Sequence, residues 1–282
     1  MTIVVTGATG HLGRLTIQSL LAKGVPASEI VGLGRQIDKI ADLGVTTKQV
    51  AYEDPEALRA AFEGADKVFF ISGSEAGNRL GQHRNVVDAA RAANVGVVVY
   101  TSAPKADTTD MKLAAEHLTT EQWIKDAGLP YVFLRNSWYV ENYSVEQALA
   151  HGLFGAAGDG KISASPRADY AEAAASVLTT EGHEGKVYEL GGEAFTLTEL
   201  AAEIAKQSGR PVTYTDLGED KYREMLVGVG VPEGFAAILA DVDRAASQGA
   251  LHVPREDLEK LLGRPATPLA TSIKAELAAA QG

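Results

Sequence analysis

Short apolar runs rich in β-branched residues alternate with amphipathic, alanine-rich segments through the first half of the chain. The helical patterns cover roughly His11–Lys23, Pro55–Phe62, Asn78–Ala93 and Leu113–Lys125, and the strand-like runs are Ile3–Thr6, Ile30–Leu33, Thr46–Val50, Val68–Ser72, Val97–Thr101, Tyr131–Leu134 and Val187–Leu190. In runs such as KVFFIS and VGVVVYTS the apolar residues are continuous rather than alternating, which is typical of parallel strands buried on both faces. The pattern predicts an α/β fold with a doubly wound parallel (Rossmann) sheet and right-handed crossovers.

The character of the chain changes after Arg135. The segment HGLFGAAGDGKISASPR is rich in glycine, and the tail from Phe195 is mainly of helical pattern with glycine and proline breaks. The stretch PVTYTDL could add one short strand. We therefore expect a smaller, mainly helical C-terminal lobe that closes over the carboxyl ends of the strands. The expected division gives residues 1–135 plus about 160–192 to the Rossmann domain, and about 136–159 plus 193–282 to the smaller lobe.

Composition and charge exclude several classes of protein. Of 282 residues, 26 are basic and 37 acidic, giving a net charge of −11 that disfavours nucleic acid and anionic membranes as partners. There is no cysteine and the six histidines show no ligand spacing, so no metal site is expected. Met1 leads directly into a strand pattern without signal-peptide features, and no apolar run is long enough to span a bilayer. A cytoplasmic protein without membrane insertion is expected.

Three glycines between the first strand and the first helix suggest a phosphate-binding loop. Gly7, Gly10 and Gly13 form Gly-x-x-Gly-x-x-Gly, a spacing that permits a tight turn and close approach of the backbone to a pyrophosphate at the helix N-terminus. A purely structural turn is the alternative, but the position after the first strand favours a dinucleotide. The loop residues expected to contact it are Gly7, Ala8, Thr9, Gly10, His11, Leu12 and Gly13.

The end of the second predicted strand indicates which dinucleotide binds. Sites for NAD usually place an acidic residue there, whereas this chain reads VGLGRQ and has Arg35. A guanidinium pairs with a 2′-phosphate, and a carboxylate would repel it. The alternative is a solvated surface arginine. We predict NADPH as the cofactor in preference to NADH.

The fourth and fifth predicted strands end in ISGSE and YTSAP. Ligands in this fold lie outside the carboxyl ends of the strands. The groove for the dinucleotide is therefore expected to include Ser72, Gly73, Ser74, Thr101 and Ser102. Ordinary strand-to-loop chemistry explains these residues equally well.

Several longer segments resemble one family. The segments VTGATGHLG, HRNVVDAARAANV, YTSAPKADT, LRNSWYVENY, AAGDGKISASPRADYAEAAA and GKVYELGG together resemble the NmrA-like branch of atypical short-chain dehydrogenases/reductases, including bacterial NAD(P)H:quinone oxidoreductases and triphenylmethane reductases. The resemblance covers nearly the whole chain. It implies NADPH use, an NADP-binding Rossmann domain and a substrate held between this domain and the smaller lobe.

The Tyr-x-x-x-Lys pair that most short-chain dehydrogenases use is missing from TTDMKLAAEHLTTE. The extended members of the family place the lysine four residues before a glutamate, and two registers fit. His117 precedes Glu121 in the register we prefer, and Lys112 precedes Glu116 in the other. The position of the tyrosine then holds Leu113 or Thr108, respectively. Neither register supplies a tyrosine.

This absence favours particular hydride acceptors. An alkoxide formed from an ordinary ketone is strongly basic and needs a positioned acid. A quinone instead yields a phenolate-type oxygen whose conjugate acid has a pKa of roughly 10, like that of tyrosine, and a cationic triarylmethyl carbon needs hydride alone. We therefore expect an NADPH-dependent oxidoreductase that transfers hydride to a quinone or similar conjugated aromatic acceptor.

Candidate residues on the substrate side follow LRN. Trp138, Tyr139 and Tyr143 could form a flat wall for an aromatic acceptor, and Asn142 could donate a hydrogen bond to a quinone oxygen or to a carboxamide. Packing in the core is the alternative for the aromatic residues. The candidates for a catalytic role are Asn142, His117 and Tyr139, although a structural contact is an equally good explanation for His117.

Contacts or positions are also predicted for five further residues. Arg167 either contacts Asp169 or faces the substrate. His83 is expected on a helix surface or at a cap, and Thr196 or Thr198 is expected to cap a helix.

A second class of function remains open. Some NmrA-like proteins are regulators that sense redox state by binding NADP(H), with little or no catalysis. A reductase would have a small aromatic substrate, such as a quinone or a cationic dye, as its partner, whereas a sensor would need a protein partner surface. Either protein could be a monomer or a homodimer.

Overall fold

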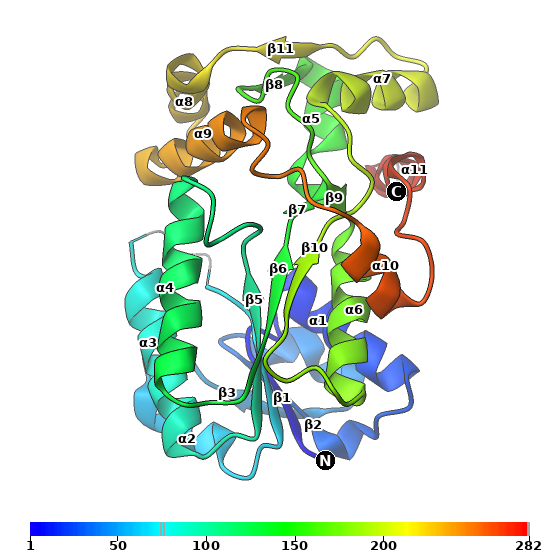
Figure 1. Cartoon of the computed structure of the whole chain (residues 1–282). Coiled ribbons are helices and arrows are strands. Elements are labelled where there is room, and N and C mark those ends of the chain that lie inside the picture. The colour runs from blue at the N-terminus through cyan, green and yellow to red at the C-terminus, as the bar shows by residue number, and fades with distance from the viewer. Residues whose placement is uncertain (74, 76, 281–282) are drawn as a thin grey trace.

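The computed structural model describes residues 1–73, 75 and 77–280. Its centre is a parallel sheet of seven strands in the order β10-β6-β5-β4-β1-β2-β3 (Figure 1). The strands are β1 (Ile3–Val5), β2 (Ile30–Gly34), β3 (Thr46–Gln49), β4 (Lys67–Phe70), β5 (Val97–Ser102), β6 (Tyr131–Asn136) and β10 (Val187–Leu190). The strand order reverses between β1 and β4, which is the point where this fold binds ligands. The predicted doubly wound parallel sheet is confirmed.

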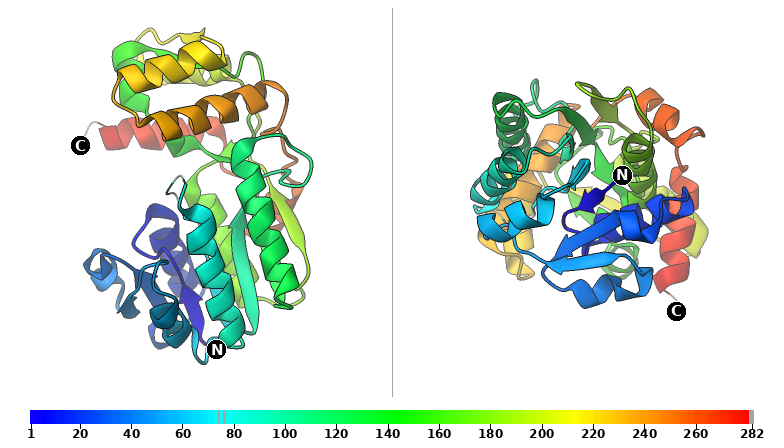
Figure 2. Two further views of the ribbon diagram at one scale, coloured as in Figure 1. Left: turned by 90° about the vertical axis from the view of Figure 1, so that its left-hand side faces the viewer. Right: turned by 90° about the horizontal axis from the view of Figure 1, so that it is seen from below.

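Helices cover both faces of this sheet, as Figure 2 shows from two further directions. One hydrophobic cluster joins the sheet to α1 (His11–Ala22), α6 (Arg167–Thr179) and α10 (Glu256–Leu262). A second cluster joins the opposite face to α2 (Pro55–Phe62), α3 (Arg79–Ala92) and α4 (Lys112–Asp126). The inner strands β1, β4, β5 and β6 are buried on both faces, so their sequences are mostly apolar without alternation, whereas the edge strand β3 is polar and largely exposed.

The alternation of side chains along β6 determines which face each residue at its carboxyl end meets. Leu134 packs in the cluster of α1 and α6, whereas Phe133 packs in the cluster of α2, α3 and α4. Successive side chains point to opposite faces of a sheet. Arg135 therefore faces α4, and Asn136 faces α1 and α6.

A smaller lobe lies above the carboxyl ends of the strands (Figure 1). A third hydrophobic cluster holds it together. Its helices are α5 (Val145–His151), α7 (Leu197–Ser208), α8 (Glu219–Gly228), α9 (Glu233–Ser247) and α11 (Leu269–Ala280), and two short sheets pair β8 (Leu153–Gly155) with β11 (Tyr214–Asp216) and β7 (Trp138–Tyr139) with β9 (Ala164–Ser165). The strand expected in PVTYTDL is β11, whereas β7, β8 and β9 were not expected.

The expected division of the chain between the two parts stays a prediction. Near the C-terminus, α10 packs against α6 and β10 rather than within the smaller lobe. At the start of α7, Thr196 forms a capping box with Glu199: the Thr196 hydroxyl accepts from the Glu199 backbone N–H at 3.1 Å, and the Thr196 N–H donates to Glu199 Oε2 at 2.8 Å. The expected cap is therefore confirmed at Thr196.

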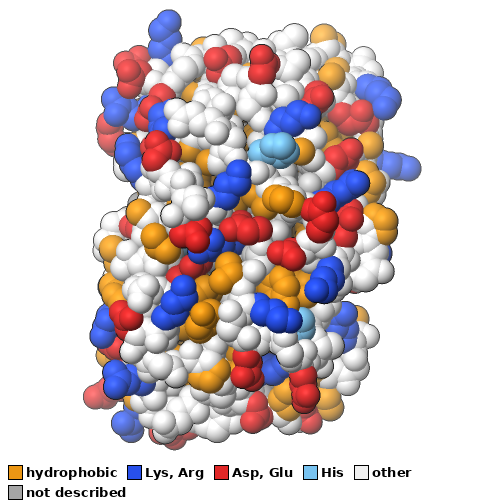
Figure 3. Space-filling view, viewed as in Figure 1, with side chains coloured by type: hydrophobic (Ala, Val, Ile, Leu, Met, Phe, Trp, Pro, Cys, Tyr) orange, Lys and Arg blue, Asp and Glu red, His pale blue; other side chains and the backbone are white. Residues whose placement is uncertain are grey.

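The surface shows no gathering of basic side chains on the face drawn in Figure 3, where both charges are interspersed. Within the described part of the chain, no helix combines the length and apolar character needed to cross a membrane.

Candidate cofactor and active site

A cavity of about 560 Å³ opens at the carboxyl ends of β1 to β4. Six of its lining residues were expected at a dinucleotide site: Gly7, Thr9, Gly10, Arg35, Ser72 and Gly73. The others are Gly34, Gln36, Lys39, Val50, Ala51, Tyr52, Glu53, Ile71, Glu75 and Gln82. The cavity therefore lies at the switch point of the sheet, where the fold places its ligands.

The glycine loop has the geometry of a phosphate cradle. Gly7 adopts a left-handed φ of +58°, and its carbonyl accepts from the Gly10 N–H at 3.0 Å. A Cβ on Gly13 would collide with the Gly7 carbonyl oxygen and lie 2.7 Å from Ala8 Cα, so only glycine lets α1 pack this close to the loop. The N-cap residue Gly10 offers no capping side chain, and the first turn of α1 holds no acidic residue. Among the residues that the structure describes, no side chain caps the first N–H groups of α1, and these groups can bind an anion.

Four expected loop residues do not line the cavity. Ala8 and Leu12 are buried in the sheet cluster beneath the loop, Gly13 is buried against the loop backbone, and the side chain of His11 is exposed at the start of α1. These four residues determine the shape of the loop. His11, Leu12 and Gly13 also supply backbone N–H groups of the first turn of α1.

Two basic side chains, those of Arg35 and Lys39, lie beyond the end of β2. Arg35 is 70% exposed and pairs with Glu75 at 2.7 Å, so the ion pair joins the end of β2 to the loop after β4 with β1 between them. Lys39 lies on the 3-10 helix η2 (Ile37–Leu43) and lines the same cavity. Arg14 donates to the Lys39 carbonyl at 2.7 Å and pairs with Asp42, which holds η2 against α1. Sequence reasoning missed Lys39, whose only signal is its position four residues after Arg35.

Side chains from neighbouring elements fix the loop after β4. The Ser72 N–H donates to Thr101 Oγ1 at 2.8 Å, and the Gly73 N–H donates to His83 Nε2 at 2.9 Å. Ser102 donates to Glu121 at 2.6 Å. Thr101 and Ser102 do not line the cavity, because their hydroxyls are bound within the protein. Ser74 lies outside the described residues.

Tyr52 is a further residue that sequence reasoning missed. Its hydroxyl donates to the Ile71 carbonyl at 2.7 Å and lies 2.6 Å from Thr6 Oγ1. It therefore joins the ends of β1 and β4 beneath the cavity.

The expectation that His83 lies on a helix surface or at a cap is wrong. His83 is fully buried beside Tyr100 and His117. Since its Nε2 accepts from the Gly73 N–H, its proton is on Nδ1, which lies 2.8 Å from the Thr120 hydroxyl. Burial, aided by Arg79, lowers the pKa of His83 to about 3, and the ring is neutral.

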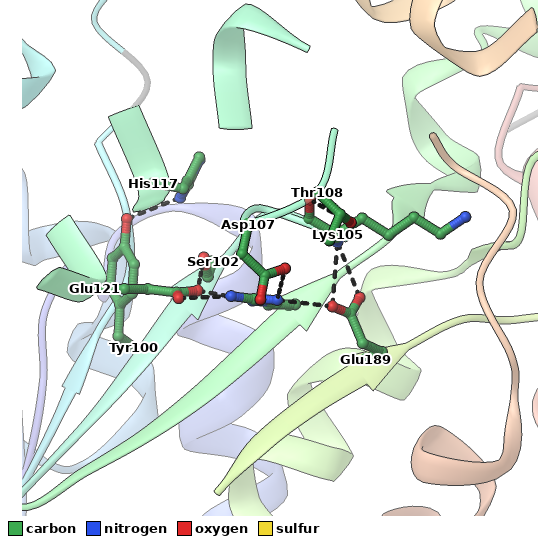
Figure 4. A network of polar contacts seen from close by, with 9 residues as sticks. Tyr100, Ser102, Lys105, Asp107, Thr108, His117, Glu121 and Glu189 are labelled. Carbon is green, nitrogen blue, oxygen red and sulfur yellow. Dashed lines mark hydrogen bonds and ion pairs between the residues drawn. The ribbon is translucent and has the colours of Figure 1, made fainter. Parts of the chain in front are cut away.

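His117 lies on α4 and is buried. Its Nδ1 is 2.8 Å from the Tyr100 hydroxyl, and burial lowers its pKa well below the ordinary value (Figure 4). Glu121 is fully buried and binds both nitrogens of one edge of Arg135, at 2.9 and 2.8 Å. The Lys112 side chain, in contrast, is 71% exposed at the start of α4. His117 and Glu121 are thus the pair that faces the sheet.

The candidates on the substrate side gather around Arg167, on the opposite side of the sheet from His117. The Arg167 guanidinium lies 4.5 Å from the ring centre of Tyr139 and donates to Asn142 Oδ1 at 2.7 Å. Trp138 and Tyr143 are half-buried and pack against the cluster of the smaller lobe. Tyr139 and Asn142 are therefore brought together, whereas His117 is apart from them.

Arg167 and Asp169 have separate partners. The Arg167 N–H and guanidinium meet Glu141, at 2.8 and 3.6 Å. Asp169 is buried and accepts from Ser165, Arg264 and Thr267 at 2.8 to 2.9 Å. The sequence left open whether Arg167 contacts Asp169 or faces the substrate, and the structure shows no contact between the two side chains.

Comparison with known proteins places the chain in a family. Residues 7–181 match the NAD(P)H-binding family. The chain is 51% identical to Escherichia coli quinone oxidoreductase 2, over 96% of its own length and 97% of the relative's. The structure of E. coli NADPH-dependent quinone oxidoreductase with NADPH matches with a TM-score of 0.94 and 50% identity, covering 98% of this chain and 100% of that one.

A second solved structure is also similar. Citrobacter sp. triphenylmethane reductase with NADP(H) matches with a TM-score of 0.89 and 40% identity, covering 98% of this chain and 100% of that one. The family resemblance expected from the sequence is confirmed, and the chain belongs to the NAD(P)H-binding family.

Proposed function

We propose that the protein is an NADPH-dependent reductase that transfers hydride to a quinone or a similar conjugated aromatic acceptor. The observation that carries the proposal is the cavity itself, which combines a glycine-lined helix N-terminus with two cations at the end of β2. This arrangement suits a dinucleotide with an additional phosphate on its adenosine ribose.

The residues present fit NADPH at both of its anionic groups. The free N–H groups at the start of α1 would hold the diphosphate, since a Cβ at Gly13 is excluded and no side chain occupies the cap. Arg35 and Lys39 would hold the 2′-phosphate. Glu75 forms an ion pair with Arg35 across the cavity. The 2′-phosphate would replace the Glu75 carboxylate as the partner of the Arg35 guanidinium.

When bound, NADPH supplies the hydride. The protein offers no Tyr-x-x-x-Lys acid for the acceptor, because the position of the tyrosine holds Leu113 or Thr108. The position of the lysine holds the buried, neutral His117 or the exposed Lys112. Acceptors whose product oxygen is a weak base, or which become neutral on receiving hydride, need no such acid. Positioning of the acceptor then becomes the main task of the side chains.

We place the acceptor beside Tyr139, with Trp138 and Tyr143 as aromatic walls and Asn142 at the edge. Burial raises the pKa of Tyr139, so its phenol stays protonated and can donate a hydrogen bond. The two relatives named above act on acceptors of the proposed kind, a quinone and triphenylmethane dyes. Their similarity over nearly the full chain supports this acceptor class.

The test is NADPH oxidation by the purified protein with a panel of quinones and cationic triarylmethyl dyes, compared with simple ketones. We expect rapid oxidation with the first two groups, slow oxidation with ketones, and a preference for NADPH over NADH. Tight NADPH binding without acceptor-dependent oxidation would instead indicate a redox-sensing regulator.

Two further properties remain predictions. Consumption of NADPH suits a cytoplasmic location, which cell fractionation would test. The choice between monomer and homodimer would be decided by sedimentation of the purified protein.

A further inference from the structure

One buried polar atom at the carboxyl end of the sheet lacks a partner. Asn136 is 7% exposed, and within the described part of the chain its Oδ1 accepts no hydrogen bond. Its Nδ2 donates to the Tyr139 hydroxyl at 3.3 Å. An unpaired buried amide oxygen is costly, so a ligand that supplies the missing donor would gain affinity from it.

The position of this atom points to the dinucleotide. Asn136 is the last residue of β6 and faces α1 and α6, as does Leu134 two residues before it. Tyr139 packs against the cluster that contains Ala8 and Leu12, so the pair lies on the same side of the sheet as the glycine loop. An extended dinucleotide with its ribose phosphate over β2 and its diphosphate at α1 runs across β4 towards β5 and β6. Its nicotinamide end would then reach the carboxyl end of β6.

The two side chains together present one acceptor and one donor. Asn136 Oδ1 is a free acceptor, and the Tyr139 oxygen already accepts from Asn136, which leaves the hydroxyl proton available to donate. A primary carboxamide carries the complementary N–H donor and carbonyl acceptor. Arg167, 4.5 Å above the Tyr139 ring, and Tyr170, in edge contact with it, hold the ring in place.

We propose that Asn136 and Tyr139 bind the carboxamide of the nicotinamide, with Asn136 Oδ1 accepting from its N–H and the Tyr139 hydroxyl donating to its carbonyl. This assignment rests on the proposed use of NADPH. It makes Asn136 a residue that orients the nicotinamide ring. It also assigns the Tyr139 hydroxyl proton to the cofactor, so that the acceptor contacts the Tyr139 ring.

The test compares dissociation constants for NADPH and its reduced 3-acetylpyridine analogue, which keeps the carbonyl but lacks the N–H. We expect the wild-type protein to bind NADPH on the order of tenfold more tightly than the analogue. In Asn136→Leu and Asn136→Ser this ratio should fall to near one. In Tyr139→Phe both nucleotides should bind more weakly with the ratio kept, because both carry the carbonyl.

Binding of 2′,5′-ADP, which has no nicotinamide, serves as the control and should be equal in all four proteins. Equal binding of NADPH and the analogue by the wild type would overturn the assignment, as would a ratio unchanged in a folded Asn136 variant. Failure of the wild type to bind NADPH at all would instead remove the proposed function. The two failures are therefore distinguishable.

Discussion

At the scale of single residues, the choice of cofactor depends on the charges at the end of β2. Arg35 and Lys39 line one cavity, and Glu75 pairs with Arg35 from the opposite side. A guanidinium can form bidentate hydrogen bonds with a phosphate, whereas an ammonium acts as a point charge. We therefore expect Arg35 to contribute more than Lys39 to the affinity for the 2′-phosphate.

Replacing these cations should remove the preference for NADPH. Arg35→Ala is expected to raise the KM for NADPH by about 10- to 100-fold, and Lys39→Ala by less, with little change for NADH, because the lost charge-assisted contacts are with the 2′-phosphate. Steady-state kinetics with both nucleotides measure this. Arg59→Ala, an exposed arginine on α2, is the matched control. An unchanged ratio of NADPH to NADH activity in Arg35→Ala would remove Arg35 from the site.

The two candidate registers of α4 make opposite predictions. His117 is buried and contacts Tyr100, whereas Lys112 is exposed and its Nζ lies 3.7 Å from Asp241. His117→Ala should therefore impair NADPH binding or turnover more than Lys112→Ala, because a cavity beside Tyr100 disturbs the carboxyl end of β5. Kinetic constants of both variants, with circular dichroism to verify folding, decide between them. The reverse ranking would favour the Lys112 register.

At the scale of elements, the close contact between α1 and its loop requires glycine at position 13. A Cβ on Gly13 would lie 2.7 Å from Ala8 Cα, whereas a Cβ on Gly10 would meet only the Gly7 carbonyl oxygen at 3.3 Å. Helix propensity alone predicts that Gly13→Ala stabilises α1 by roughly 1 kcal/mol. The steric conflict predicts the opposite sign.

We expect Gly13→Ala to lower the free energy of unfolding and to weaken NADPH binding, and Gly10→Ala to do so much less. Urea unfolding and nucleotide titration of both variants provide the measurement. A Gly13→Ala protein that is more stable than the wild type and binds NADPH normally would contradict the tight packing.

Elements with a strong apolar period were predictable, and contacts between elements were less so. All seven strands of the main sheet and the glycine turn were predicted from local pattern, because burial of the inner strands on both faces and the backbone geometry of the turn leave a direct mark on sequence. Lys39 was missed because its short 3-10 helix has no such period. His83 was misplaced because its burial depends on the Gly73 N–H, a partner from another element.

The hydroxyls of Thr101 and Ser102 show the same limit. Their position at the end of β5 was predicted, but their partners Ser72 and Glu121 come from the loop after β4 and from α4. The pairing of Glu121 with Arg135, in contrast, agrees with the spacing used to align α4, because the helix leads directly into β6.

At the scale of the whole molecule, a buried carboxyl in the smaller lobe should make stability depend on pH. Asp243 on α9 accepts from the Ala156 N–H at 2.8 Å. Burial raises its pKa to about 6, partly offset by this hydrogen bond and reinforced by Asp216. The folded protein therefore binds this proton more tightly than the unfolded chain, where the pKa is near 3.9. The free-energy cost of keeping Asp243 ionised in the folded protein is therefore absent below about pH 4 and fully present above about pH 6.

Asp243→Asn should remove this dependence. Relative to the variant, the wild type is expected to gain about 2–3 kcal/mol as the pH falls from 7 to 4. Urea unfolding at several pH values measures the difference, and Asp159→Asn, at an exposed position, should follow the wild type throughout. A constant difference between the wild type and Asp243→Asn would show that Asp243 keeps an ordinary pKa.

The most direct test of the central claim is the pre-steady-state rate of NADPH oxidation by the purified protein with a quinone, recorded from pH 6 to 9. The account predicts rapid, quinone-dependent oxidation whose rate constant is nearly independent of pH, because no protein acid is needed. Tight NADPH binding without quinone-dependent oxidation, or a rate that falls tenfold per pH unit above a single pKa, would contradict it.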